Sequence, residues 1–135
     1  MARLADTSFL IQLERRGDSL ASFTAATLGE EFAVSTTSLA ELLFGTHRAD
    51  SPRRREGRLV FINEVISQLT VCPFDYDAAQ VYARIWSELQ AAGNLIGVHD
   101  MQIAATALAR GYPVMTLNVR DFERVPGLTV IRPPA

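Results

Sequence analysis

The sequence predicts an α/β fold in which a parallel β-sheet of four to five strands is flanked by helices on both faces. Short apolar runs of strand length alternate along the chain with longer segments of helical periodicity. The length of 135 residues suits one domain with one core, which we expect to span residues 1–135. Hydrophobic residues make up 48% of the chain, and no internal repeat, low-complexity tract or linker interrupts it.

The first 35 residues predict a strand, two helices and a second strand. The first helix, expected over 7–16, carries Phe9, Leu10 and Leu13 on one face. Asp18 can cap a second helix that runs to Leu28. The two strands are expected over 3–6 and 31–35.

Residues 36–69 predict two further helices separated by a loop at 49–52. Thr37 or Ser38 can cap the first of them, which ends near Arg48. Its expected buried residues are Leu39, Leu42 and Leu43. Pro52 suits the first turn of the second helix, because its fixed backbone angle is already helical. The apolar residues of that helix are Leu59, Ile62, Val65, Ile66 and Leu69.

The second half of the chain predicts three more strands and two more helices. Asp75 or Asp77 can open a long helix that ends at Gly93, and a helix from His99 to Arg110 is closed by Gly111. The strands are expected over 70–74, 113–117 and 128–131, with the last at the edge of the sheet. Strands separated by helices favour parallel pairing, with helices covering both faces.

Composition excludes several classes of mechanism. All 13 basic residues are arginine, so neither a P-loop nor Schiff-base chemistry has its lysine. The net charge of −2 gives no general attraction to nucleic acid, so any such contact needs a local patch. Cys72 is the one cysteine and is expected in the core. With neither a signal peptide nor an apolar run of membrane-spanning length, a cytoplasmic protein is expected.

Four acidic residues occupy positions that the predicted fold brings to one edge of the sheet. Asp6 follows the first strand, Glu41 lies early in the helix after the second, Asp100 lies at a helix N-terminus, and Asp121 follows the fourth strand. Each has an ordinary alternative: a helix cap for the three aspartates and a solvated side chain for Glu41. In a doubly wound sheet, however, ligands bind outside the carboxyl ends of the strands, which all four can reach.

Such a cluster predicts a metal centre. Several carboxylates close together repel one another unless they are protonated or bridged by a cation. Oxygen ligands select a hard cation, Mg²⁺ or Mn²⁺. A site of this kind suits phosphodiester hydrolysis, because the cation neutralises the charge that develops on phosphate.

The motifs that carry these acids resemble those of the PIN-domain family over nearly the whole chain. They are Asp6-Thr7-Ser8, Ser38-Leu39-Ala40-Glu41-Leu42 with Gly45, Asp100-Met101-Gln102-Ile103-Ala104-Ala105 and Thr116-Leu117-Asn118-Val119-Arg120-Asp121-Phe122, followed by Pro126-Gly127-Leu128-Thr129-Val130. Within the family the chain is most similar to the VapC-type toxins of bacterial toxin–antitoxin pairs. Ser8 stands where many relatives carry asparagine.

The resemblance implies a Mg²⁺-dependent endoribonuclease that forms a homodimer and is held inactive by a small antitoxin protein. It makes Asp6 and Asp100 direct metal ligands, with Asp121 and Glu41 completing the site. Asn118 and Thr116 are implied as supporting polar residues.

Other polar and aromatic residues have two interpretations each. Arg53, Arg54, Arg55 and Arg58 form the densest basic patch, which is either an RNA contact or a solvated helix start. His99 is interpreted as a capping or surface residue. Tyr82 and Trp86, one helical turn apart, favour packing or a dimer interface over base stacking.

The sequence leaves two functions open as alternatives to the nuclease. One is a non-catalytic PIN-fold module that binds RNA or a protein, against which the four acids argue. The other is a phosphohydrolase of small substrates, against which the missing lysine and the missing Asp-x-Asp after the first strand argue.

Overall fold

A computed structural model describes residues 2–17, 20 and 31–134 of the chain. Its sheet has five strands in the order β3-β2-β1-β4-β5, and every neighbouring pair is parallel. The chain first adds strands on one side of β1 and then on the other, so the topological switch point lies between β1 and β4. The strands are β1 (Arg3–Ala5), β2 (Phe32–Ser35), β3 (Thr70–Cys72), β4 (Val114–Met115) and β5 (Val130–Ile131).

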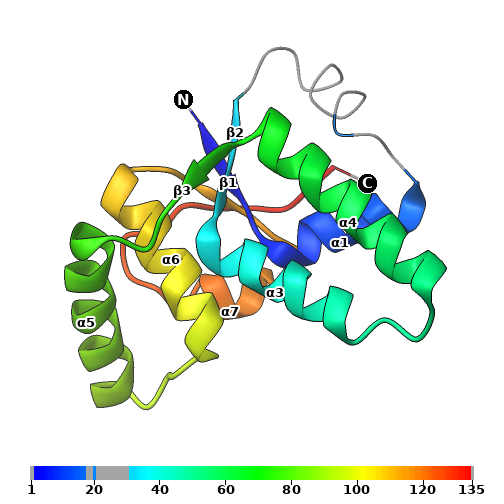
Figure 1. Ribbon diagram of the computed structural model, residues 1–135. Coiled ribbons are helices and arrows are strands. Elements are labelled where there is room, and N and C mark those ends of the chain that lie inside the picture. Colours follow the sequence, from blue (N-terminus) through cyan, green and yellow to red (C-terminus); the bar gives the residue numbers. More distant parts are fainter. Residues whose placement is uncertain (1, 18–19, 21–30, 135) are drawn as a thin grey trace.

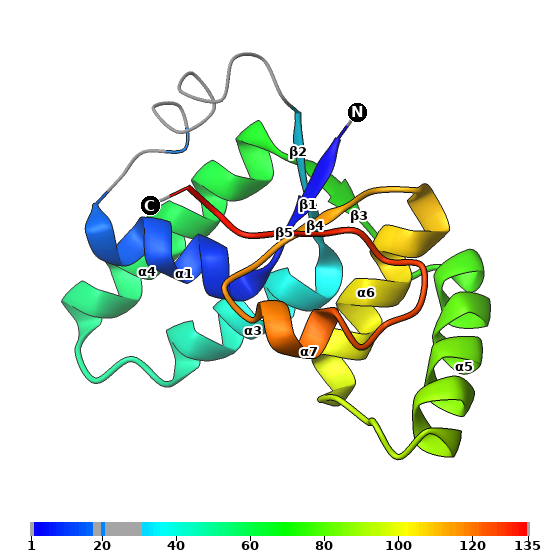
Figure 2. The ribbon, with the colours of Figure 1, turned by 180° about the vertical axis from the view of Figure 1, so that it is seen from behind.

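Helices cover both faces of this sheet, as the alternation of elements predicts (Figures 1 and 2). Leu4 and Val114 pack with α5 and α6, whereas their neighbours Ala5 and Met115 pack with α1, α3 and α4. Adjacent residues of a strand point to opposite faces, so even these short strands contribute to two cores. The helices are α1 (Thr7–Arg16), α3 (Thr36–His47), α4 (Pro52–Gln68), α5 (Tyr76–Ala91), α6 (Val98–Arg110) and α7 (Val119–Phe122).

Most predicted boundaries agree with these elements, and α1 agrees at both ends. The helix expected over 18–28 lies outside the described residues, apart from Leu20. The predicted caps of α3 are wrong: Ser35, the last residue of β2, accepts the hydrogen bond from the Ser38 N–H. The strand expected over 113–117 is shorter, because the Thr116 hydroxyl accepts the Asn118 N–H as the chain turns into α7.

The predicted buried faces of α3 and α4 need correction. Leu59 and Ile66 are 40% and 48% exposed, while Phe61, Ile62 and Val65 are buried. At 3.6 residues per turn the buried residues form one stripe and Leu59 and Ile66 flank it. Leu43 of α3 is also exposed, at 42%.

Cys72 is buried in the core on the α5–α6 side, as predicted. Tyr82 packs between Phe74 and Trp86, with ring centroids 5.6 and 5.9 Å away. None of the described helices is long and apolar enough to span a membrane.

Candidate active site

Helices α1, α3, α6 and α7 begin beyond the carboxyl ends of the central strands (Figures 1 and 2). The four predicted acids lie at or near these helix starts. Asp6 directly follows β1, Glu41 lies in the second turn of α3, and Asp100 and Asp121 lie in the first turns of α6 and α7. Burial, together with the charges of Asp6, Glu41 and Asp121, raises the pKa of the Asp100 carboxyl from 3.8 to about 6, against a lowering by the hydrogen bond from Asn118. Asp6, Glu41 and Asp121 therefore all lie close enough to Asp100 to act on its carboxyl.

The two carboxylate oxygens of Asp6 differ in their hydrogen bonding. Its side chain is buried, and its Oδ2 accepts hydrogen bonds from the hydroxyls of Ser8, at 2.8 Å, and Thr116, at 2.7 Å. Its Oδ1 is the one buried side-chain polar atom without a partner among the described residues. Although Asp6 occupies the N-cap position of α1, its side chain caps no N–H group. The helix-cap interpretation of Asp6 is therefore wrong.

Asn118 joins the other two aspartates. Its single Nδ2 donates to Oδ2 of Asp100, at 3.0 Å, and to Oδ2 of Asp121, at 3.1 Å. Neither aspartate caps a helix: Gly97 is the N-cap of α6 and Asn118 is the N-cap of α7. One amide with two hydrogens thus fixes the orientation of two carboxylates.

Glu41 is not a freely solvated side chain. The Thr7 hydroxyl donates to its Oε1 at 2.6 Å, a short bond of the kind that a charged acceptor forms. The Thr7 oxygen also lies 2.9 Å from the Ser38 hydroxyl, which lies 3.2 Å from that of Ser35. His99, whose side chain is 63% exposed, approaches the other oxygen of Glu41 at 3.5 Å. A buried row of hydroxyls therefore anchors Glu41 from the protein side.

A family model for the PIN domain matches residues 3–128 of this chain. The chain belongs to the PIN-domain family.

Curated members of this family are similar to this PIN domain along most of its length. Ribonuclease VapC1 of Rickettsia felis is 40% identical over 131 residues, which cover 97% of this chain and 96% of that protein. The tRNA(fMet)-specific endonuclease VapC of Salmonella typhimurium is 36% identical over 97 residues, which cover 72% of this chain and 71% of that protein.

Solved structures confirm the fold of the PIN domain. Crystalline VapBC2 of Rickettsia felis bound to a promoter DNA fragment superposes with a TM-score of 0.88 at 23% identity, covering 99% of this chain and 100% of that one. DNA-bound VapBC of Salmonella typhimurium superposes with a TM-score of 0.83 at 30% identity, covering 96% of this chain and 97% of that one.

The donor set of this PIN domain fits a hard divalent cation. Four carboxylates contribute only oxygen, which Mg²⁺ and Mn²⁺ prefer. The bare, buried Oδ1 of Asp6 and the raised pKa of Asp100 both indicate negative charge that protein donors leave uncompensated. Within the ranges the structure describes, no three acidic, histidine or cysteine side chains form a ready-made ligand group. The fit therefore rests on the chemistry of the donors.

Four hydroxyl residues of the site were not predicted as site residues: Thr7, Ser8, Ser35 and Ser38. Their signal is weak, because hydroxyl residues are common near helix N-termini. Ser38 does stand three residues before Glu41, which places both on the same face of α3. The four arginines predicted to contact RNA lie elsewhere, in the first turns of α4, and Arg58 is paired there with Glu14 at 2.7 Å.

Thr7→Val is expected to lower kcat by about tenfold, because the loss of a hydrogen bond that orients a metal-binding side chain typically costs 10–100-fold. Valine keeps the shape of threonine but cannot donate to Glu41. Thr7→Ser, which restores the hydroxyl, is the matched control and is expected to recover most of the activity. Initial cleavage rates and thermal melts of both variants check this. A lower melting temperature with unchanged kcat would show that Thr7 has only a structural role.

Proposed function

We propose that this PIN domain is a metal-dependent endoribonuclease that hydrolyses RNA phosphodiester bonds and serves as the toxin of a toxin–antitoxin pair. The observation that carries the proposal is the convergence of Asp6, Glu41 and Asp121 on Asp100, with a bare buried oxygen on Asp6. The similarity to proteins named ribonuclease VapC supports RNA as the substrate class.

In this proposal the four acids hold Mg²⁺ or Mn²⁺, with Asp6 and Asp100 as the first ligands. When bound, the cation supplies the positive charge that stabilises charge developing on phosphate. Ser8 and Thr116 bind one oxygen of Asp6 and so keep its other oxygen directed away from them. Asn118 keeps Asp100 and Asp121 in a fixed relation. Asp121 or Glu41 accepts a hydrogen bond from the attacking water and orients it.

The proposal includes partners and location. Residues 1–135 act as one domain in the cytoplasm, where the RNA substrate is found. A small antitoxin protein inhibits it, which the VapBC complexes among its structural relatives support. We also propose a homodimer, because large apolar side chains such as Phe44, 63% exposed, and Val60, 62% exposed, lie on its surface.

Purified protein is expected to cut single-stranded or looped RNA in Mg²⁺ or Mn²⁺ and to stop in EDTA, because its donors are all oxygen. Gel analysis of end-labelled RNA after addition of each cation measures this. Full activity in chelator, or activity with Zn²⁺ alone, would contradict the metal assignment. RNA that is bound but never cut would favour a non-catalytic binding module.

A further inference from the structure

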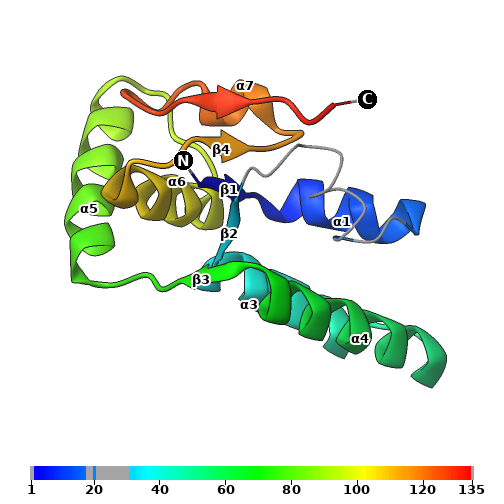
Figure 3. The same ribbon diagram turned by 90° about the horizontal axis from the view of Figure 1, so that it is seen from above.

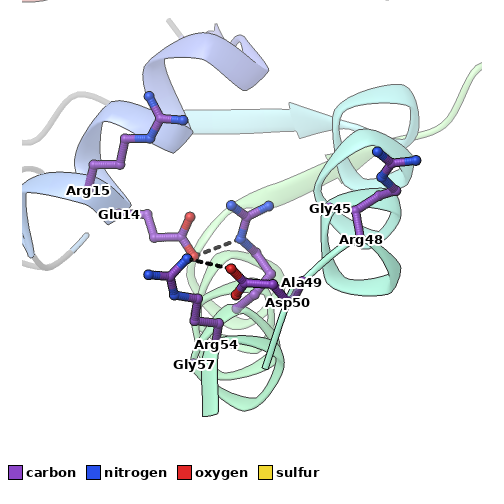
Figure 4. A pocket seen from close by; sticks show the side chains of 9 residues that line it. Glu14, Arg15, Gly45, Arg48, Ala49, Asp50, Arg54 and Gly57 are labelled. Atoms are coloured by element: carbon purple, nitrogen blue, oxygen red, sulfur yellow. Dashed lines mark hydrogen bonds and ion pairs between the residues drawn. The ribbon is translucent and has the colours of Figure 1, made fainter. Parts of the chain in front are cut away.

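A cavity of about 770 Å³ opens between the ends of α1 and α3 and the start of α4 (Figure 4). Four arginines line it, against two carboxylates: Arg15, Arg48, Arg54 and Arg58, with Glu14 and Asp50. The acids of the candidate active site lie near the other ends of α1 and α3. We call this cavity the arginine pocket, after Arg15, Arg48, Arg54 and Arg58. Its charge is opposite to that of the candidate active site.

Arg58 forms a fixed wall of the arginine pocket. Its Nε lies 2.7 Å from Oε2 of Glu14, and both side chains are about one-fifth exposed, at 22% and 21%. Its guanidinium also donates to the carbonyl of Leu42 at 3.4 Å. Gly45 makes room for this arrangement, because a Cβ there would lie 2.5 Å from Nη1 of Arg58. This pair is neutral and holds α1 against α4.

The other three arginines keep their charge available. Arg48 lies over the ring of Phe44, 5.9 Å from its centroid, and forms no ion pair with any described residue. Arg15 likewise has no ion pair within the described part of the chain. Arg54 meets Asp50 at 3.2 Å, but both side chains are more than 70% exposed, at 74% and 71%, so water competes with that pair. Arg15 and Arg48 thus line the pocket without a carboxylate partner among the described residues, and Arg54 has only a solvent-exposed one.

Local helix stability explains Arg15 and Arg48, because they lie at the C-terminal ends of α1 and α3, where the helix dipole favours cations. It does not explain Arg54. Arg54 lies in the first turn of α4, where a cation opposes the helix dipole and destabilises the helix. Arg53 and Arg55 add to that effect. An external anion at the pocket would offset this unfavourable charge at the start of α4.

The position of the pocket relative to the acids indicates which anion. α1 and α3 both begin at the candidate active site and end at the pocket, and α4 lies beside them (Figures 1 and 3). From Thr7 to Arg15 the rise along α1 is about 12 Å. Successive phosphates of a stacked strand are about 3.4 Å apart along its axis, so a few nucleotides cover this distance.

We propose that the arginine pocket binds backbone phosphates of the RNA substrate a few nucleotides away from the bond that is cut. This inference rests on the proposed ribonuclease function. Arg15, Arg48 and Arg54 contact the phosphates, while Arg58 keeps the pocket open. A remote cationic anchor offsets the repulsion between RNA and the four carboxylates, in a chain whose net charge is −2.

The test is RNA binding in EDTA, which does not depend on cleavage. Fluorescence anisotropy with labelled 20-nucleotide oligouridine gives Kd over a range of salt concentrations. The double variant Arg48→Ala/Arg54→Ala is expected to raise Kd at least about tenfold and to reduce the salt slope by about 1.4, since each single-strand phosphate contact contributes about 0.7. Arg84→Ala/Arg110→Ala, on α5 and α6, is the control with the same loss of charge and is expected to change Kd less than twofold.

Two outcomes would overturn the pocket assignment. One is a double variant whose Kd and salt slope match those of the control. The other is a pocket that binds a polyglutamate peptide while the same variant leaves RNA affinity intact, which identifies an acidic protein as its ligand. Failure of the proposed function is distinct: a wild-type protein that shows this binding pattern but cuts no RNA in Mg²⁺ keeps the pocket and loses the nuclease.

Discussion

Asp6→Asn is expected to lower RNA cleavage about a thousandfold and to abolish growth arrest by the expressed toxin. The asparagine carbonyl can still accept the hydroxyls of Ser8 and Thr116, so the local structure survives. The substitution removes the negative charge of the Asp6 carboxylate, whose Oδ1 is buried without a hydrogen-bond partner. A bound cation stabilises developing phosphate charge by several kcal/mol, and 1.36 kcal/mol corresponds to a tenfold rate.

Asp77→Asn is the matched control for this prediction. Asp77 is an exposed aspartate in the first turn of α5, and the substitution removes the same charge. Its cleavage rate is expected to equal that of the wild type. Initial rates on a fluorescent RNA and growth curves after induction compare the two variants. An Asp6→Asn protein that is folded and still within tenfold of wild-type activity would exclude Asp6 as a metal ligand.

Asp100→Asn is expected to melt higher than the wild type in EDTA, although it removes a proposed metal ligand. The carboxylate of Asp100 is destabilised by burial and by three neighbouring acids, and the amide carries no charge. Its carbonyl still accepts the hydrogen bond from Asn118. For a partly exposed group the gain is about 1 kcal/mol after solvent screening, or about 4 °C.

The pH dependence of the wild type follows from the same carboxyl. Its pKa is raised from 3.8 to about 6 in the folded state, so the folded protein binds the proton more tightly than the unfolded chain does. Protonated Asp100 therefore contributes stability below pH 4 or so, and this contribution is lost as the pH rises to about 6. In EDTA the melting temperature of Asp100→Asn should not show this part of the pH dependence.

Magnesium should reverse the order of the two proteins. A cation that binds only the folded state at a hundredfold excess over its Kd adds about 2.7 kcal/mol. The wild type is expected to gain this stabilisation, whereas Asp100→Asn gains much less. Thermal melts of both proteins in EDTA and in Mg²⁺ provide the four values needed. If Asp100→Asn melts lower in EDTA and keeps the full Mg²⁺ gain, then Asp100 is not part of the metal centre.

The sequence was sufficient for the fold class and for the shared location of the four acids. Alternating periodicities predict α1 at both ends, and a parallel sheet requires that residues following its strands share an edge. Asp6 after β1 and Asp121 after β4 could therefore be placed together, although 115 positions separate them in the numbering. Sequence order and handedness rules carry this information without any side-chain detail.

Only the tertiary structure decided what each side chain does. Asp6 sits at an N-cap position and caps nothing, because Ser8 and Thr116 hold one of its oxygens. Thr116 and Thr7 reach their partners across 110 and 34 positions, distances at which no local pattern operates. The arginine pocket likewise joins α1 to the α3–α4 connection, so the sequence indicates a basic run at 53–58 but not its neighbours Arg15 and Arg48. Periodicity describes one element at a time, whereas hydrogen bonds and charges act between elements and depend on how these pack.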